Sequence, residues 1–260
     1  MFTVKQRDVL YEHVLRVAKE DERVAAGALV GSLAVDEGDR YSDLDLTFAI
    51  SDPTRVADVL DDWTRALREE LSAIPLVDLD RVPTTYRVFL LPELLQLDLS
   101  VTPAAVFRPA GPRFRLLFGD TAPNEPGTQS TGTGDVFIPT PLVADDIFGW
   151  GVIYATHAYR CIKRGLVWQA EHYVGALRDH ALSLACLRYG LPAAQARGYD
   201  KVPSEVLDRL EESHVGNLRP GDLQAALSAC VSALGHEAEQ AHLPEAGEIV
   251  GRLSELSADL

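Results

Sequence analysis

The sequence predicts an α+β protein in which a strand-rich half is followed by an all-helical half. Strand patterns, meaning alternating or branched and aromatic residues, occur only in the first half, at 24–32, 44–50, 76–82, 86–91, 95–101 and 114–119. Helical spacing of apolar residues dominates after residue 141. Segregation of strands and helices along a chain is typical of an α+β domain followed by a helical bundle.

The expected boundary is the stretch 120–141, which is dense in Gly, Pro, Ser and Thr. We therefore expect a first domain over 1–119, with a small mixed sheet flanked by helices. The residues 120–141 would form a linker loop, and 142–260 would form a helical domain.

Helices are expected on both sides of this boundary. In the first half, apolar spacing predicts one over 4–22, and Ser51-Asp52-Pro53 resembles the start of a second that runs to about residue 73. In the second half, the pattern predicts helices at 142–164, 167–190, 203–213, 220–242 and 244–258.

The composition indicates which classes of binding partner the protein could have. A net charge of -15 argues against a long nucleic acid, which needs a basic surface, and favours a cationic small molecule. There is no apolar run long enough to span a bilayer, and the N-terminus lacks the features of a signal peptide. We expect a cytoplasmic protein without a membrane partner, whose three cysteines are buried thiols.

The most informative feature is an acidic pair on a predicted strand. Asp43 and Asp45 alternate with Leu44 and Leu46, so the two carboxylates should share one face while the leucines enter the core. Two carboxylates on one face repel each other unless a cation lies between them. Magnesium meets this need because it prefers oxygen ligands and leaves positions open for phosphate oxygens.

A third acid, Asp98, lies between Leu97 and Leu99 on a later predicted strand. If that strand lies beside the first, three carboxylates converge and could hold two magnesium ions. One ion would clamp a triphosphate, and the other would activate an attacking hydroxyl.

Gly31-Ser32, at the end of the first predicted strand, supplies the complementary donors. Glycine lets the backbone approach a phosphate, and the N–H groups and serine hydroxyl that follow can donate to it; a helix starting there would add its dipole. Taken singly, a Gly-Ser is usually a turn, an Asp-Leu-Asp triplet a strand edge or cap, and Asp98 a surface acid. Their combination predicts a site for a metal-bound nucleoside triphosphate.

This pattern resembles the nucleotidyltransferase superfamily that includes the kanamycin and streptomycin nucleotidyltransferases and the minimal MNT proteins. The resemblance covers roughly residues 20–105. It implies that Gly31 and Ser32 form the phosphate-binding turn, that Asp43 and Asp45 are the metal-binding pair, and that Asp98 is the third strand acid.

The helical half resembles, more weakly, the accessory domain that completes the acceptor pocket in the antibiotic-modifying members. Glu171 and Arg178 share one helix face, where Glu171 could accept a proton and Arg178 could bind a phosphate oxygen, although such pairs are usually solvated charges. Ser42 and Lys201 are further candidates for nucleotide binding. Whether Asp98 or Glu171 is the general base stays open.

The resemblance implies magnesium-dependent transfer of a nucleoside monophosphate from an NTP, most simply ATP, to a hydroxyl of a small molecule, with release of pyrophosphate. An aminoglycoside-like antibiotic is one such acceptor, and a homodimer is compatible with this reading. Two alternatives are an MNT-type regulatory protein that adenylylates a protein partner and a non-catalytic nucleotide-binding module.

Overall fold

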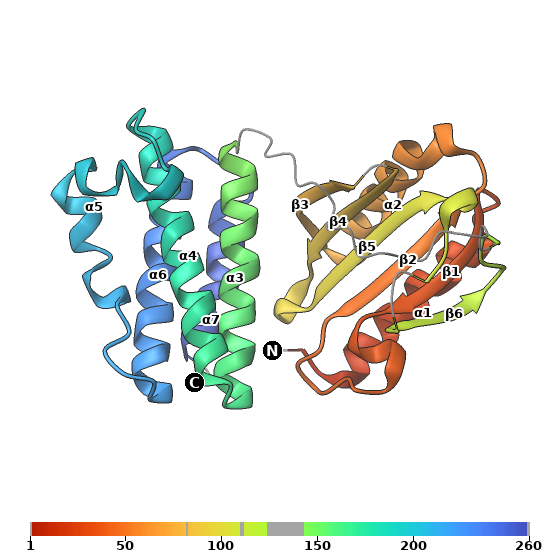
Figure 1. Cartoon of the computed structure of the whole chain (residues 1–260), viewed down its shortest axis with the longest axis horizontal. Helices are drawn as coiled ribbons and strands as arrows, with labels where there is room; N and C mark the ends of the chain where they lie inside the picture. Colours follow the sequence, from red (N-terminus) through yellow and green to blue (C-terminus); the bar gives the residue numbers. More distant parts are fainter. Residues whose placement is uncertain (1, 82, 110–111, 124–142, 259–260) are drawn as a thin grey trace. The chain divides into compact units, whose positions relative to one another are not determined.

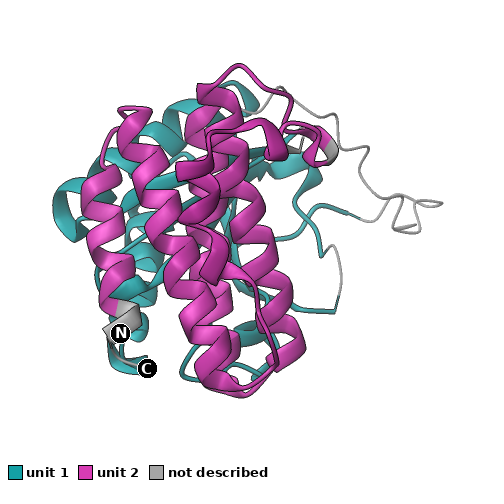
Figure 2. Cartoon of the chain, turned by 90° about the vertical axis from the view of Figure 1, so that its left-hand side faces the viewer, with its two compact units in different colours: residues 1–139 teal, residues 140–260 magenta. Residues whose placement is uncertain are grey.

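The computed structural model describes residues 2–81, 83–109, 112–123 and 143–258 (Figure 1). The chain divides into two compact units, residues 1–139 and 140–260, which Figure 2 shows in different colours. Of the expected linker 120–141, the part from 124 onward lies outside the described residues.

A six-stranded mixed sheet forms the centre of the first unit, in the order β3-β4-β5-β2-β1-β6. The pairing of β2 with β5 is parallel, and the other four pairings are antiparallel. In this strand order the two parallel strands, β2 and β5, lie at the centre of the sheet. The strands are β1 (Val24–Val30), β2 (Leu44–Ile50), β3 (Ile74–Arg81), β4 (Thr84–Leu90), β5 (Gln96–Pro103) and β6 (Phe114–Phe118).

Two helices, α1 (Val4–Glu20) and α2 (Val56–Leu71), cover one face of this sheet. Helix α1 begins with a capping box between Thr3 and Gln6, which satisfies N–H groups that a helix start leaves without intrahelical acceptors. Both helices contribute to one apolar core with the even-numbered residues 44–50 of β2. The odd-numbered residues of β2 therefore face the side of the sheet opposite to the helices.

In the described residues of the second unit, all regular secondary structure is helical. Its helices are α3 (Ala144–Arg164), α4 (Val167–Arg188), α5 (Ser204–Asp208), α6 (Pro220–Gln240) and α7 (Ala246–Ala258). Helix α4 packs against α3 and α6, and α7 packs against α6. The core between them is made of fully buried side chains such as Val174, Leu177, Leu223 and Leu234.

The prediction of one helix over 203–213 is wrong. The structure has the short helix α5 and then a separate 3-10 turn, Glu211–Ser213. The backbone bonds after α5 run to the residue three positions back: the Leu210 N–H donates to the Leu207 carbonyl at 2.9 Å, and the Ser213 N–H donates to the Leu210 carbonyl at 3.0 Å. This stretch therefore has 3-10 and not α-helical hydrogen bonding. No described helix is both long and apolar enough to cross a membrane.

Candidate functional site

The predicted alternation of acids and leucines along β2 is observed. Asp43 immediately precedes β2 and Asp45 is its second residue, and both are partly exposed. Leu44 and Leu46 are each 1% exposed and belong to the core beneath the helices. Both carboxylates therefore lie on the face of the sheet opposite to α1 and α2, near the end at which β2 begins.

Asp98 lies directly beside this pair. Strand β5 runs parallel to β2 with Asp98 in register with Asp45, while Leu97 and Leu99, its neighbours in sequence, are 0% exposed. Adjacent strands lie about 4.8 Å apart, and partners in register point to the same face. The condition stated from the sequence, that the two acid-bearing strands be neighbours, is therefore met.

Gly31 brings the backbone up to the Asp45 carboxylate. Its φ of 70° and ψ of -154° lie in a region that is essentially restricted to glycine. A Cβ at this position would overlap the Oδ2 atom of Asp45. Only glycine therefore allows the end of β1 to pass so close to the acid.

Ser32 opens a 3-10 turn of four residues, Ser32–Val35. No α-helix begins at this point, so the helix dipole considered from the sequence is not available to a phosphate here. What the turn offers to an anion is a set of backbone N–H groups and the Ser32 hydroxyl. Its position next to Gly31 places these donors at the end of β1.

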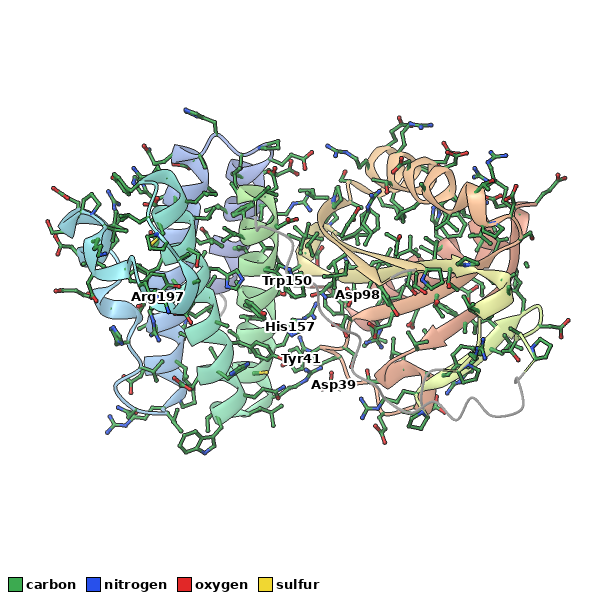
Figure 3. All side chains as sticks on the ribbon, turned by 45° about the horizontal axis from the view of Figure 1, so that its top comes forward. Asp39, Tyr41, Asp98, Trp150, His157 and Arg197 are labelled. Atoms are coloured by element: carbon green, nitrogen blue, oxygen red, sulfur yellow. The ribbon has the colours of Figure 1, made fainter. Side chains whose placement is uncertain are left out.

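The turn that leads into β2 is held by internal hydrogen bonds. The Ser42 side chain, which is buried, accepts from the Asp39 N–H at 3.0 Å, and an Asp39 carboxylate oxygen accepts from the Tyr41 N–H at 2.8 Å. Figure 3 labels Asp39, Tyr41 and Asp98 on the first unit. The Ser42 hydroxyl thus has a local structural role, and its contact with a nucleotide stays a prediction.

A residue that the sequence reasoning missed supports Asp98. Gln96 is 2% exposed, and its Nε2 donates to Oδ1 of Asp98 at 2.8 Å. Because the two residues are two apart on one strand, they share a face. The signal in the sequence was the alternation of polar and apolar residues along this strand, which places Gln96 on the same face as Asp98.

The donor set suits a magnesium ion that arrives with a triphosphate. Mg²⁺ is usually held by one or two carboxylates together with phosphate oxygens, and seldom by a cage made only of protein. In the described residues no group of three or more His, Cys, Asp or Glu side chains could hold a metal ion by itself. The expectation that three acids hold two ions therefore stays a prediction, and phosphate oxygens would have to complete the coordination.

The candidates from the helical half belong to the second unit. Arg178 on α4 donates to the carbonyl of Ser213 at 3.2 Å, so it joins α4 to the 3-10 turn that precedes α6. Glu171 lies on the same side of α4 and is partly exposed. Lys201 is exposed at the end of the 3-10 turn Tyr199–Lys201. The roles of these three residues at the acids of the first unit stay predictions.

Helices α3 and α4 share a cluster of rings, of which Figure 3 labels Trp150 and His157. Tyr154 stacks on Trp150 and on Tyr173 at centroid distances of 5.7 and 6.0 Å, and His157 meets Tyr173 edge-on at 5.0 Å. His180 contacts Tyr154 at 5.0 Å, and burial lowers its pKa. His157 and His180 thus pack against aromatic rings of α3 and α4.

All three cysteines are buried and carry no disulfide, as predicted. Burial raises the pKa of Cys161 and Cys186, and it raises the pKa of Cys230 to about 12. A thiol with such a pKa stays protonated and unreactive near neutral pH.

No family model matches this chain, and no curated protein sequence does so. Among solved structures, an aminoglycoside 6-adenyltransferase from Bacillus subtilis is similar to it, with 14% sequence identity and a TM-score of 0.38. The match covers 95% of this chain and 97% of that chain. At this level of similarity it says nothing about the activity of this chain.

Proposed function

We propose that the chain is a nucleotidyltransferase. It would transfer a nucleoside monophosphate from a magnesium-bound NTP, ATP in the simplest case, to a hydroxyl of a small molecule. The observation that supports this most is the in-register parallel pairing of Asp45 with Asp98, next to the backbone of Gly31. Carboxylates and N–H donors at one end of a sheet suit a metal-bound triphosphate, because the metal needs oxygen ligands and the phosphate oxygens need hydrogen-bond donors.

In this proposal Asp43, Asp45 and Asp98 hold the metal side of the substrate. Bound magnesium would neutralise phosphate charge and stabilise an in-line displacement. The N–H groups that follow Gly31, with the Ser32 hydroxyl, would donate to phosphate oxygens. Because β2 and β5 are the central strands, hydrogen-bonded on both sides, they would keep Asp45 and Asp98 in a fixed geometry.

The reaction forms one bond and breaks one. The acceptor oxygen would bond to the α-phosphorus, and the bond from that phosphorus to the bridging oxygen of the β-phosphate would break. The acceptor proton would pass to a carboxylate, for which Asp98 and Glu171 are the two candidates, and pyrophosphate would leave with the electron pair. Arg178, Lys201 and Ser42 are proposed as further phosphate contacts.

The acceptor class rests on charge. A net charge of -15 favours a cationic small molecule, such as an aminoglycoside-like antibiotic, over a polyanion. A cytoplasmic location, where NTPs and magnesium are available, belongs to the same proposal.

The test is a turnover assay with the purified full chain. The protein is incubated with Mg²⁺, each NTP in turn and a panel of aminoglycosides; pyrophosphate release and the mass gain of the acceptor are measured. We expect release with at least one pair and none from Asp45→Asn. Asp8→Asn, an exposed acid on α1, is the matched control and should behave as the wild type.

Other outcomes separate the alternatives. Labelling of a co-purifying protein, without transfer to any small molecule, would favour the regulatory reading. Magnesium-dependent triphosphate binding without any transfer would favour a binding module. Absence of such binding by calorimetry would reject the proposal.

A further inference from the structure

Arg7 is a cation at a position where α1 otherwise buries apolar side chains. It is 6% exposed and continues the buried stripe of Leu10, Val14 and Ala18 toward the start of the helix. Within the described part of the chain it has no carboxylate partner, and its Nε is buried without an acceptor. Such a charge is costly to bury, so core stability alone gives no reason for an arginine here.

The guanidinium group donates its hydrogen bonds to one turn, residues 39–42. Its Nη1 donates to the carbonyl of Asp39 at 2.6 Å and to the carbonyl of Ser42 at 3.0 Å. These carbonyls mark the two ends of the turn, whose closing bond runs from the Ser42 N–H to the Asp39 carbonyl at 3.2 Å. Arg7 therefore clamps the turn from the side of α1, at both ends at once.

The next residue after this turn is Asp43. The peptide that joins Ser42 to Asp43 contains the carbonyl that Arg7 binds, so the bond fixes the direction in which the backbone enters β2. A change of the turn would move the Asp43 carboxylate relative to Asp45, which the sheet holds in place. Asp43 is the acid most dependent on such support because it lies just outside the strand.

We infer that Arg7 is a positioning residue for the candidate metal site, acting on Asp43 through the 39–42 turn. The inference rests on the proposed function, whose site it refines. Residues that orient metal ligands from behind typically change metal affinity or activity by about 10- to 100-fold when they are replaced.

The test compares Arg7→Met, Arg7→Lys and the control Arg16→Met in the full chain. Methionine keeps an unbranched stem without donors, and lysine keeps the charge without the fork. Arg16 lies on the same helix but is half exposed and pairs with Glu20. Two quantities are measured: the Mn²⁺ affinity in the presence of an ATP analogue with a non-hydrolysable α,β-bridge, by electron paramagnetic resonance, and hydrogen exchange of the amides over 39–45.

We expect Arg7→Met to bind Mn²⁺ about 10- to 100-fold more weakly, Arg7→Lys to fall between it and the wild type, and Arg16→Met to match the wild type. Exchange should become faster over 39–45 and stay unchanged over α2. Affinities are corrected for the folded fraction, read by circular dichroism at the same temperature.

Unchanged Mn²⁺ affinity in a folded Arg7→Met would overturn the inference, even if that variant melts at a lower temperature. If Arg7→Met does not fold, Arg7→Lys decides, and an affinity equal to that of the wild type would overturn it. If the wild type itself binds no Mn²⁺ with the nucleotide, the proposed function fails and the inference fails with it. The two failures are thus distinguished by the wild type.

Discussion

Neutralising Asp98 should make the metal-free protein more stable and abolish its activity at the same time. Asp98 and Asp45 are neighbours in register on adjacent strands, so their two carboxylates face the same way. Asp98→Asn removes one charge but keeps the Oδ1 acceptor that the buried Gln96 side chain uses. The substitution therefore removes repulsion and leaves the hydrogen bond intact.

The size of the effect follows from the strand spacing. Two unit charges about 5 Å apart repel by about 1 kcal/mol in a water-like medium and by about 3 kcal/mol at an effective dielectric constant of about 20. Both carboxylates are partly exposed, so we expect a gain near the lower figure. For a chain of this size, about 1 kcal/mol corresponds to a rise in Tm of roughly 2–4 °C.

The assay is thermal unfolding in EDTA at low salt, with turnover measured in parallel. Asp78→Asn is the matched control, because this acid on β3 binds the Arg87 guanidinium in a two-pronged pair at 2.6 and 2.7 Å and its loss should lower Tm. In 1 M salt, where the screening length is about 3 Å, the gain from Asp98→Asn should shrink.

An Asp98→Asn protein that melts below the wild type under these conditions would refute the idea that the acids repel each other. Retained turnover would refute the role of Asp98. A gain in stability together with full activity would separate the two parts of the reasoning and leave only the electrostatic one.

Three further perturbations test other parts of the first unit. Gly31→Ala should lower the free energy of unfolding by roughly 1–3 kcal/mol and abolish triphosphate binding, because alanine would have to adopt a conformation restricted to glycine and its Cβ would clash with Asp45. A variant with the Tm of the wild type and the same triphosphate affinity by calorimetry would contradict this. Gln96→Leu should raise the Mg²⁺ concentration for half-maximal turnover by about 10-fold or more with little change at saturating Mg²⁺; an unchanged Mg²⁺ titration would count against it. Hydrogen bonds from Arg23 lower the pKa of Asp21 to about 2 from 3.8, so the ionised carboxylate stabilises the fold fully above about pH 4 and this stabilisation is lost as pH falls toward 2. In Asp21→Asn the free energy of unfolding should therefore depend less on pH between about 4 and 2, and the same pH dependence as in the wild type would disprove this.

Local patterns in the sequence predict the strand that carries the acids. Alternation places Leu44 and Leu46 in the core and their acidic neighbours outside, because the side-chain period of a strand is a property of the segment itself. A close approach of the backbone at Gly31 was predicted toward a phosphate, and the structure shows one toward the Asp45 carboxylate. The acid-bearing strand and Gly31 could both be located from short segments of the sequence.

Strand order and supporting contacts depend on tertiary structure. That β5 lies beside β2 could be stated only as a condition, because the partner of a parallel strand is not encoded within the strand. The role of Arg7 was missed because its acceptors are backbone carbonyls far along the chain, which leave no side-chain pattern. The prediction of one helix over 203–213 was wrong because the change to 3-10 hydrogen bonds at Leu210 and Ser213 cannot be read from the spacing of apolar residues.

The parallel pairing of β2 and β5 also determines when the site can exist during synthesis. Gly31 and Asp45 leave the ribosome well before Asp98, and β2 has its β5 partner only after residue 103 has emerged. A nascent chain that ends within β4 has Gly31, Ser32 and the pair Asp43 and Asp45 but lacks the strand that brings Asp98 beside them. Assembly of the proposed triphosphate site is thereby tied to completion of the sheet, and an unfinished chain would lack one of its three acids.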